Sequence, residues 1–115
     1  MNQDIARTEL DVLWPDGRRV RVTIAVGQPY RDDHLSAWRC PVRLDGMFAR
    51  LADIAGEDSL QALLLALRLA HQQLAYAEAK GAKLLFPGEE PDDPASGFDL
   101  ESYFGGLGRD PNSPV

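Results

Sequence analysis

Few side chains in this sequence could serve as nucleophiles, general bases or metal ligands. The candidates are one cysteine, Cys40, and two histidines, His34 and His71. Cys40 alternates with Trp38 and Val42, so we expect it to face the core, where burial raises a thiol pKa and suppresses reactivity. His71 falls on the expected core face of a helix, where a hydrogen-bonded packing histidine is favoured over a base. The sequence therefore offers no activated nucleophile.

The acidic residues form neither a catalytic pair nor a metal site. His34 lies beside two aspartates in one loop, but three adjacent side chains without a distant fourth ligand are a weak metal signature. That aspartate pair and Asp92–Asp93 are sequence neighbours, and nothing holds two carboxylates across a substrate. The glycines of residues 105–108 follow no strand and open no helix, unlike a phosphate-binding loop. We predict a protein that is not an enzyme, with no catalytic residue, metal or cofactor.

Length and composition are typical of one soluble domain. The chain has 115 residues, of which 44% are hydrophobic and 26% charged, enough for one core. A single cysteine excludes an intramolecular disulfide. The longest apolar stretch, residues 62–67, is far shorter than the ~20 residues of a membrane span, and no secretory signal is visible. We therefore expect a cytoplasmic protein that does not enter the membrane.

The net charge of −6 is concentrated at the C-terminal end. Residues 88–115 hold seven acidic residues against Arg109, which gives −6, whereas residues 1–87 hold 11 acidic and 11 basic residues. This split predicts a single domain over residues 1–87 and a flexible acidic, Pro/Gly-rich tail over residues 88–115. A nucleic-acid-binding protein would show the opposite sign of charge, so nucleic acid is an unlikely partner.

Alternating hydrophobic residues predict an antiparallel sheet. Residues 8–14 and 20–26 alternate around the turn Pro15-Asp16-Gly17, which predicts a hairpin. A third strand is expected over residues 38–44, either at an edge or bulged at Pro41, because proline cannot donate to the ladder. Residues 47–54 are expected to form the fourth strand.

One long helix is expected after the sheet. Asp58 and Gln61 predict a capping box at its start, and Gly81 a left-handed end. Residues 83–86 could add a short fifth strand. The sequence thus predicts an α+β fold, in which an antiparallel meander of about four strands packs on one long helix in the C-terminal half of the chain. The helix face expected to cover the sheet consists of Leu60, Leu63, Leu64, Leu67, His71 and Leu74.

A second apolar stripe of the helix, at Leu65, Leu69 and Tyr76, cannot cover the same sheet. Scattered surface leucines are common, but the stripe could also contact the chain's own tail or form a homodimer. On the outer face of the sheet, the arginines are interpreted as ion-paired with Glu9 and Asp11. Alternatives are an anion-binding face and a face covered by the acidic tail. These arginines are Arg19, Arg21, Arg39 and Arg43.

The tail carries an aromatic cluster that ordinary linkers lack. It could dock on the domain or remain free until a partner arrives. In the second case Phe98, Tyr103 and Phe104 would anchor a partner protein, and Asp92, Asp93 and Glu101 would steer it.

The segment Trp38-Arg39-Cys40-Pro41-Val42-Arg43-Leu44-Asp45-Gly46, followed by Asp58-Ser59-Leu60-Gln61-Ala62-Leu63, resembles an uncharacterised family of short bacterial proteins, a domain of unknown function. The resemblance covers about residues 7–86. It implies a bacterial cytoplasmic protein and supplies no catalytic residues.

We therefore expect a non-enzymatic protein-interaction module, such as an immunity or regulatory partner of another bacterial protein. The alternative is a small-ligand-binding or minor enzymatic domain. It would use His34 and residues 29–36 of the polar loop expected over residues 27–36. A deep, mostly apolar pocket with convergent polar groups beside that loop would favour this alternative.

Overall fold

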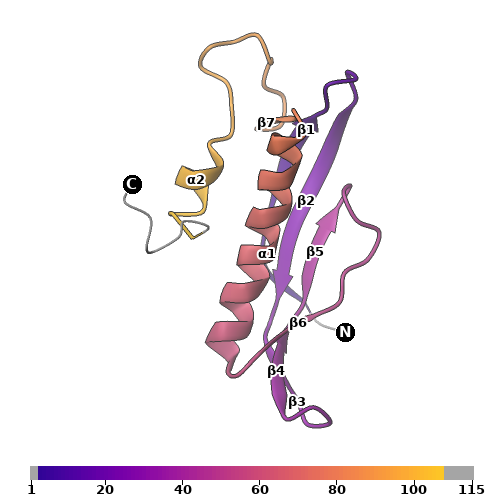
Figure 1. Ribbon diagram of the computed structural model, residues 1–115, viewed down its shortest axis with the longest axis vertical. Coiled ribbons are helices and arrows are strands. Elements are labelled where there is room, and N and C mark those ends of the chain that lie inside the picture. The colour runs from indigo at the N-terminus through magenta and orange to yellow at the C-terminus, as the bar shows by residue number, and fades with distance from the viewer. Residues whose placement is uncertain (1–2, 108–115) are drawn as a thin grey trace.

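Two antiparallel sheets support one long helix in the computed structural model, which describes residues 3–107 (Figure 1). The first sheet has the order β5-β2-β1-β7 and the second the order β3-β4-β6. The predicted four-stranded antiparallel sheet, the long helix and the short last strand are confirmed. The elements are β1 Asp4–Leu13, β2 Arg19–Gly27, β3 Tyr30–Asp32, β4 Ala37–Cys40, β5 Val42–Asp45, β6 Ile54–Gly56, α1 Ser59–Ala79, β7 Lys83–Leu85 and α2 Leu100–Tyr103.

Local signals at the ends of α1 act as predicted. The Asp58 carboxylate accepts a hydrogen bond from the Gln61 backbone N at 2.7 Å, and the Gln61 side-chain oxygen accepts one from the Glu57 N at 2.7 Å. The first bond satisfies an amide that the first helical turn leaves without a partner, whereas the second reaches the amide of the residue before the N-cap, one position further back than in a standard capping box. At the other end Gly81 has φ 96°, the left-handed conformation that glycine adopts without steric cost.

The predicted third strand divides at Pro41. Residues before Pro41 form β4, which pairs with β3 and β6, whereas residues after it form β5, which pairs with β2. Pro41 lacks an N–H and cannot continue a ladder, but its carbonyl accepts a hydrogen bond from the Gly27 N at 3.0 Å. The chain therefore passes from one sheet to the other at this proline.

Two further strand predictions are wrong. The fourth strand expected over residues 47–54 is absent, because most of this segment is irregular and only β6 at its end pairs, with β4. The polar loop expected over residues 27–36 contains β3 and a four-residue turn. Both segments are short or alternate poorly, so their pairing depends on neighbours that are distant in sequence.

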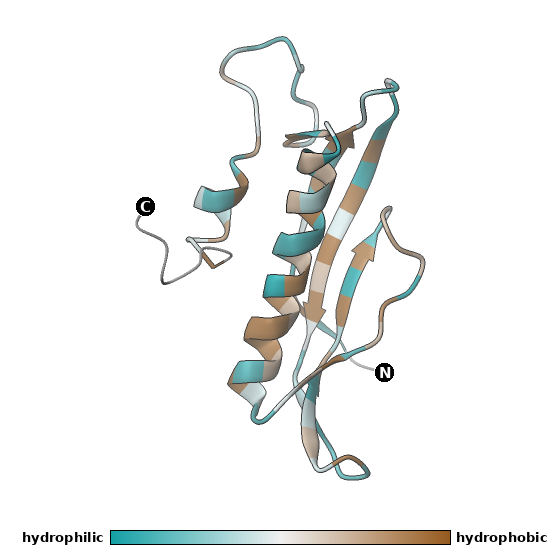
Figure 2. Cartoon of the chain, viewed as in Figure 1, coloured by the Kyte–Doolittle hydropathy of each residue, from teal (hydrophilic) through white to brown (hydrophobic). Residues whose placement is uncertain are grey.

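Helix α1 faces the core mainly through alanines, and the leucine stripe predicted for it reaches the core only in part, through Leu74 and the partly buried Leu63 and Leu67. Ala62, Ala66, Ala70 and Leu74 are fully buried, whereas Leu60 is 62% exposed. Small side chains allow a close approach: a Cβ on Gly56 of β6 would lie 2.5 Å from the Ala62 backbone N. Figure 2 shows the apolar residues of α1 continuing around its outer side, away from the sheets.

The main core lies between α1 and the first sheet, and residues beyond position 87 complete it. Phe98 is 4% exposed and Leu100 is 6% exposed, and both pack with Leu74, Leu84 and sheet residues. The Phe98 N donates to the Leu84 carbonyl at 2.9 Å, which ties this segment to β7. The domain boundary expected at residue 87 thus separates residues that share one core. We refer to residues 86–107 as the acidic lobe.

Candidate functional site

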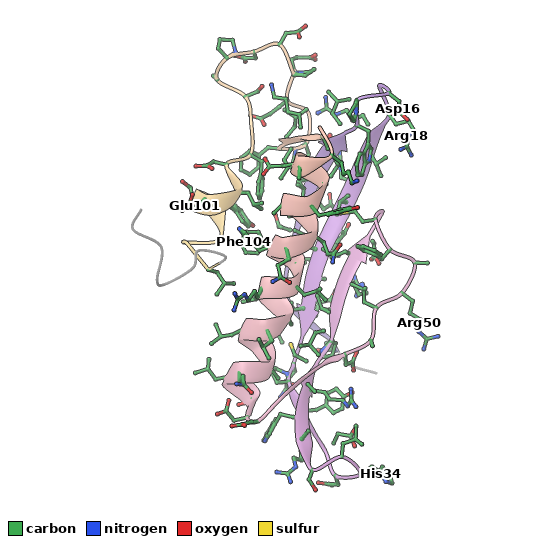
Figure 3. All side chains as sticks on the ribbon, viewed as in Figure 1. Asp16, Arg18, His34, Arg50, Glu101 and Phe104 are labelled. Carbon is green, nitrogen blue, oxygen red and sulfur yellow. The ribbon has the colours of Figure 1, made fainter. Side chains whose placement is uncertain are left out.

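The acidic lobe packs on the C-terminal half of α1 through its aromatic residues. The Phe98 ring centroid lies 4.4 Å from that of Tyr103 and 4.9 Å from that of Phe86. Phe104 meets the His71 ring edge-on at 5.3 Å, and Figure 3 shows it turned toward α1. Of the three predicted anchors, Phe98 is therefore buried, Phe104 is half-buried and Tyr103 is 46% exposed.

Polar contacts organise the lobe's backbone. One Glu89 carboxylate oxygen accepts hydrogen bonds from the Phe86 N at 2.7 Å and the Gly97 N at 3.1 Å. The Ser96 hydroxyl donates to the Glu90 carbonyl at 2.7 Å, and it also contacts the Asp93 carbonyl at the same distance. These bonds close the loop between β7 and α2 on itself and hold the backbone that carries its exposed acidic side chains.

The outer surface of the lobe is negatively charged. Asp92, Asp93 and Glu101 are exposed, and Glu101 points away from α1 (Figure 3). The sequence has no lysine, arginine or histidine from residue 84 to residue 107. On the adjacent face of α1, burial and then the charge of Asp99 raise the pKa of Glu78 above its ordinary value. The predicted steering acids are thus all exposed, Asp92 and Asp93 on the loop between β7 and α2 and Glu101 on α2 itself.

An apolar groove opens between this lobe, α1 and the N-terminal half of β1. Its volume is about 120 Å³. Beside it β1 is a sheet edge, because β7 pairs only with Asp11–Leu13. Sequence reasoning missed the groove, since only the shortness of β7 leaves the edge open. The lining residues are Ala6, Arg7, Thr8, Ile24, Val26, Leu67, Tyr103 and Phe104.

Residues 6–98 match the family described as Domain of unknown function (DUF6968). The chain belongs to this family. The match confirms the resemblance to an uncharacterised family and extends beyond the expected end at residue 86 to Phe98, which completes the core. No curated protein and no solved structure matches the chain.

The four arginines predicted for the outer sheet face of this DUF6968 domain are held in ion pairs. The Arg19 Nε lies 2.8 Å from Asp11, and Arg21 binds the same carboxylate and lies 3.3 Å from Glu9. Asp11 is only 4% exposed. Burial acts to raise the pKa of Asp11, but the hydrogen bonds from Arg21 and Arg19 outweigh it and hold that pKa below its ordinary value.

The other two arginines also have carboxylate partners. Arg43 lies 2.8 Å from Asp4 and 3.1 Å from Asp45. Arg39 belongs to the second sheet, where it lies 2.8 Å from Asp32, so the four arginines do not share one face. The acidic lobe packs on the α1 side of the first sheet and does not cover the outer face, where Arg19 and Arg21 hold the buried carboxylate (Figure 1).

An open polar hollow lies beside the β3–β4 hairpin and is lined in part by Tyr30, Arg39, Arg50 and Asp53. The Tyr30 hydroxyl donates to the Asp53 carboxylate at 2.6 Å. This hydrogen bond, followed by burial, raises the pKa of Tyr30. His34 lies at the tip of the hairpin, and Figure 3 shows it far from Arg50. The hollow is neither deep nor mostly apolar, which are the features expected of a ligand pocket.

The remaining titratable candidates lie apart. Cys40 is fully buried, and burial followed by the charge of Asp53 raises the pKa of its thiol. It packs with Val26, Ala62 and neighbours in the second core cluster, whereas His71 faces Phe104. Within residues 3–107 no cluster of three or more potential ligands could hold a metal ion. Across the same residues, none of the helices has the length and apolar character needed to cross a bilayer.

The second stripe of α1 is only partly open. Leu65 is 36% exposed and Tyr76 is 60% exposed, whereas Leu69 packs against the second core cluster. The Lys80 ammonium lies 5.2 Å from the centroid of the Tyr76 ring, within the range of a cation–π contact. This face therefore combines two exposed apolar residues with one lysine beside Tyr76.

Proposed function

We propose that this DUF6968 protein is a non-enzymatic interaction module that binds a positively charged surface of another protein, as an immunity or regulatory partner in the bacterial cytoplasm would. One observation carries the proposal: a folded lobe, fixed to the core by Phe98, exposes Asp92, Asp93 and Glu101 on a segment, residues 84–107, whose sequence contains no basic residue. Fixed like charges steer an oppositely charged partner and favour a fast encounter.

The same lobe supplies a contact residue beside its charges. Tyr103 is 46% exposed, and its ring is held between those of Phe98 and Phe104, at 4.4 and 5.6 Å. A tyrosine held in this way loses little conformational entropy on binding, and tyrosine is enriched at binding hot spots. The burial of Cys40 and the packing of His71 on Phe104 are consistent with binding and provide no reactive group for catalysis.

Photo-crosslinking tests the proposal in cells of the source organism. A photoreactive residue at Asp92 is expected to give a discrete adduct with one protein, whereas the same residue at Asp33, another exposed acid, gives none. Asp92→Asn with Asp93→Asn should then slow association with that protein about tenfold at low salt. A matched pair with the same charge change, Asp33→Asn with Glu57→Gln, should leave it within about twofold. Identical adducts at both positions, or none, would contradict the proposal.

Small-ligand binding at the β3–β4 hairpin is a second candidate. The convergence of Tyr30, Arg39 and Arg50 on one hollow favours it. However, Tyr30 is hydrogen-bonded to Asp53 and Arg39 to Asp32, so an anionic ligand would have to displace existing partners. Calorimetry with small carboxylates and phosphates, in wild type and Arg50→Ala, tests the candidate, and heats that are equal in both proteins would exclude it.

We also propose a homodimer through the exposed stripe of α1, with Leu65 and Tyr76 at its centre and Leu69 beneath them. Sedimentation should show a concentration-dependent dimer in wild type. Leu65→Asp should abolish it, whereas Leu60→Asp, the same change at a 62% exposed position on another face of α1, should not. Leu65→Asp is preferred to Leu69→Asp because Leu69 also packs in the core. A monomer at every concentration would remove this proposal.

A further inference from the structure

Within residues 3–107, no strand pairs with the N-terminal half of β1 on the side away from β2, which leaves a backbone edge there. In an antiparallel ladder the amide groups of successive residues point alternately to the two sides of the strand. The Trp14 N donates to the Arg18 carbonyl at 2.8 Å, so the even-numbered residues of β1 bond to β2. The N–H and C=O groups of Arg7 and Glu9 are therefore directed at the opposite edge, where β7 does not reach.

Hydrogen bonds on the two neighbouring strands, β2 and β7, agree with this alternation of even- and odd-numbered residues along β1. The Gly27 N of β2 donates to the Pro41 carbonyl on the β5 side, so the odd-numbered residues of β2 face away from β1. The Leu84 carbonyl of β7 accepts from the Phe98 N, so Leu84 also faces away from β1 and from its cross-strand neighbour Val12. The strand register therefore indicates that the backbone N–H and C=O groups of Arg7 and Glu9 point away from β2.

The apolar groove lies directly beside this edge, on the α1 side. The β1 residues that face it, Ala6 and Thr8, are small, and Leu67 and Phe104 form its far wall. A volume of about 120 Å³ suits one medium-sized apolar side chain, since an apolar cavity of about 150 Å³ holds a benzene molecule. A strand added to the edge would point alternate side chains toward this groove.

Building on the proposed function, we infer that β1 residues 4–10 receive an extended segment of the positively charged partner as an additional strand. Main-chain hydrogen bonds to Arg7 and Glu9 would hold the segment, and one apolar side chain would enter the groove. The acidic lobe forms the groove's rim through Tyr103 and Phe104, so basic residues on either side of the apolar one complement its charge.

The charges and register of β1 argue against a second copy as the occupant. A two-fold axis at Arg7 would place Arg7 opposite its own copy, and like charges directly opposite are destabilising. An axis at Thr8 would pair only about residues 6–10, because β7 covers each strand from Asp11 onward. Either arrangement also brings two acidic lobes together, each with six acidic and no basic residues over 88–107.

A defined peptide tests the inference on the full chain. The probe is a nine-residue peptide of alternating lysine and valine, and a glutamate–valine peptide serves as its charge control. Peptide binding should slow hydrogen exchange of the Arg7 and Glu9 amides at least tenfold and leave the Thr8 amide unchanged. Arg7→Pro, which removes one outward N–H but no β1–β2 bond, should weaken binding at least tenfold. Arg7→Ala, which removes the same side chain but keeps the N–H, should weaken it less than threefold.

The outcomes separate this inference from the proposed function. Equal peptide affinity of Arg7→Pro and Arg7→Ala overturns the inference, even where Asp92→Asn with Asp93→Asn still weakens binding and so supports the acidic surface. Equal affinity for the lysine and glutamate peptides contradicts the proposed preference for a positively charged partner. If Arg7→Pro does not fold, Thr8→Trp fills the groove without altering the backbone and should weaken binding to the same extent.

Hydrogen-exchange rates of the Arg7 and Glu9 amides in the protein without peptide would identify any other occupant of the β1 edge. Arg7 and Glu9 amides that are already protected, and lose protection on dilution, would show that a second copy occupies the edge. Protection that is independent of concentration would show that another segment of the same chain occupies it. Either result overturns the inference.

Discussion

At the scale of single residues, Asp11 is the charged group on which the first sheet depends most. It is 4% exposed and receives hydrogen bonds from Arg19 and Arg21 on the neighbouring strand. We expect Asp11→Asn to lower the free energy of unfolding at pH 7 by about 1.5–3 kcal/mol, the range for hydrogen bonds to a charged group. Urea denaturation of wild type and variant measures this change in the free energy of unfolding. Asp45→Asn, at an exposed ion pair with Arg43, should change stability by less than about 0.5 kcal/mol.

The effect of Asp11 should depend on pH in one direction. Its folded-state pKa is lowered, so its ionised form contributes stability above the unfolded-state pKa of about 4, and this contribution is lost as the pH falls through the lower folded-state pKa. The stabilities of wild type and Asp11→Asn should therefore converge below about pH 4. A difference that is constant from pH 7 to pH 3 would show that the carboxylate charge is not the cause.

At the scale of elements, the alanine face of α1 sets the distance between helix and sheets. Ala66 is fully buried, so Ala66→Leu must displace neighbouring groups, and overpacking of this kind typically costs about 1–3 kcal/mol. Ala79→Leu makes the same chemical change at an exposed position and should leave the thermal midpoint nearly unchanged. Equal midpoints for the two variants would show that α1 does not pack through this face.

The alanine face of α1 also illustrates which features of the fold could be predicted from the sequence and which could not. Turns and caps were predictable because one or two residues decide them, as at Asp58 and Gly81. The orientation of α1 was not, because ranking residues by hydrophobicity selects leucines, whereas close packing selects the alanine stripe between the two leucine stripes. Pro41 predicted an interruption of the third strand but not the passage of the chain from one sheet to the other. That passage depends on β2, which pairs with the residues after Pro41, and on β6, which pairs with the residues before it.

The candidate site was only partly predictable for a related reason. The acidic residues of the lobe could be found from composition, because charge needs no knowledge of the fold. The groove could not, since it depends on where β7 ends against β1 and on where Phe104 meets His71. Both are contacts between segments that lie far apart in the sequence, and neither leaves a local pattern.

At the scale of the whole molecule, the acidic lobe belongs both to the core and to the proposed binding surface, and two aromatic residues should separate these roles. Phe98 is 4% exposed and packs with Leu74, Leu84 and Leu100. Phe98→Ala should therefore lower the free energy of unfolding by about 3–5 kcal/mol, as other buried phenylalanine truncations do. Tyr103 is 46% exposed, so Tyr103→Ala should cost no more than about 1 kcal/mol but should abolish the photo-adduct formed at position 92. Thermal and urea unfolding, measured beside the crosslinking yield, check both expectations. If both variants unfold like wild type, the lobe is not docked in solution and its aromatics act only when a partner arrives.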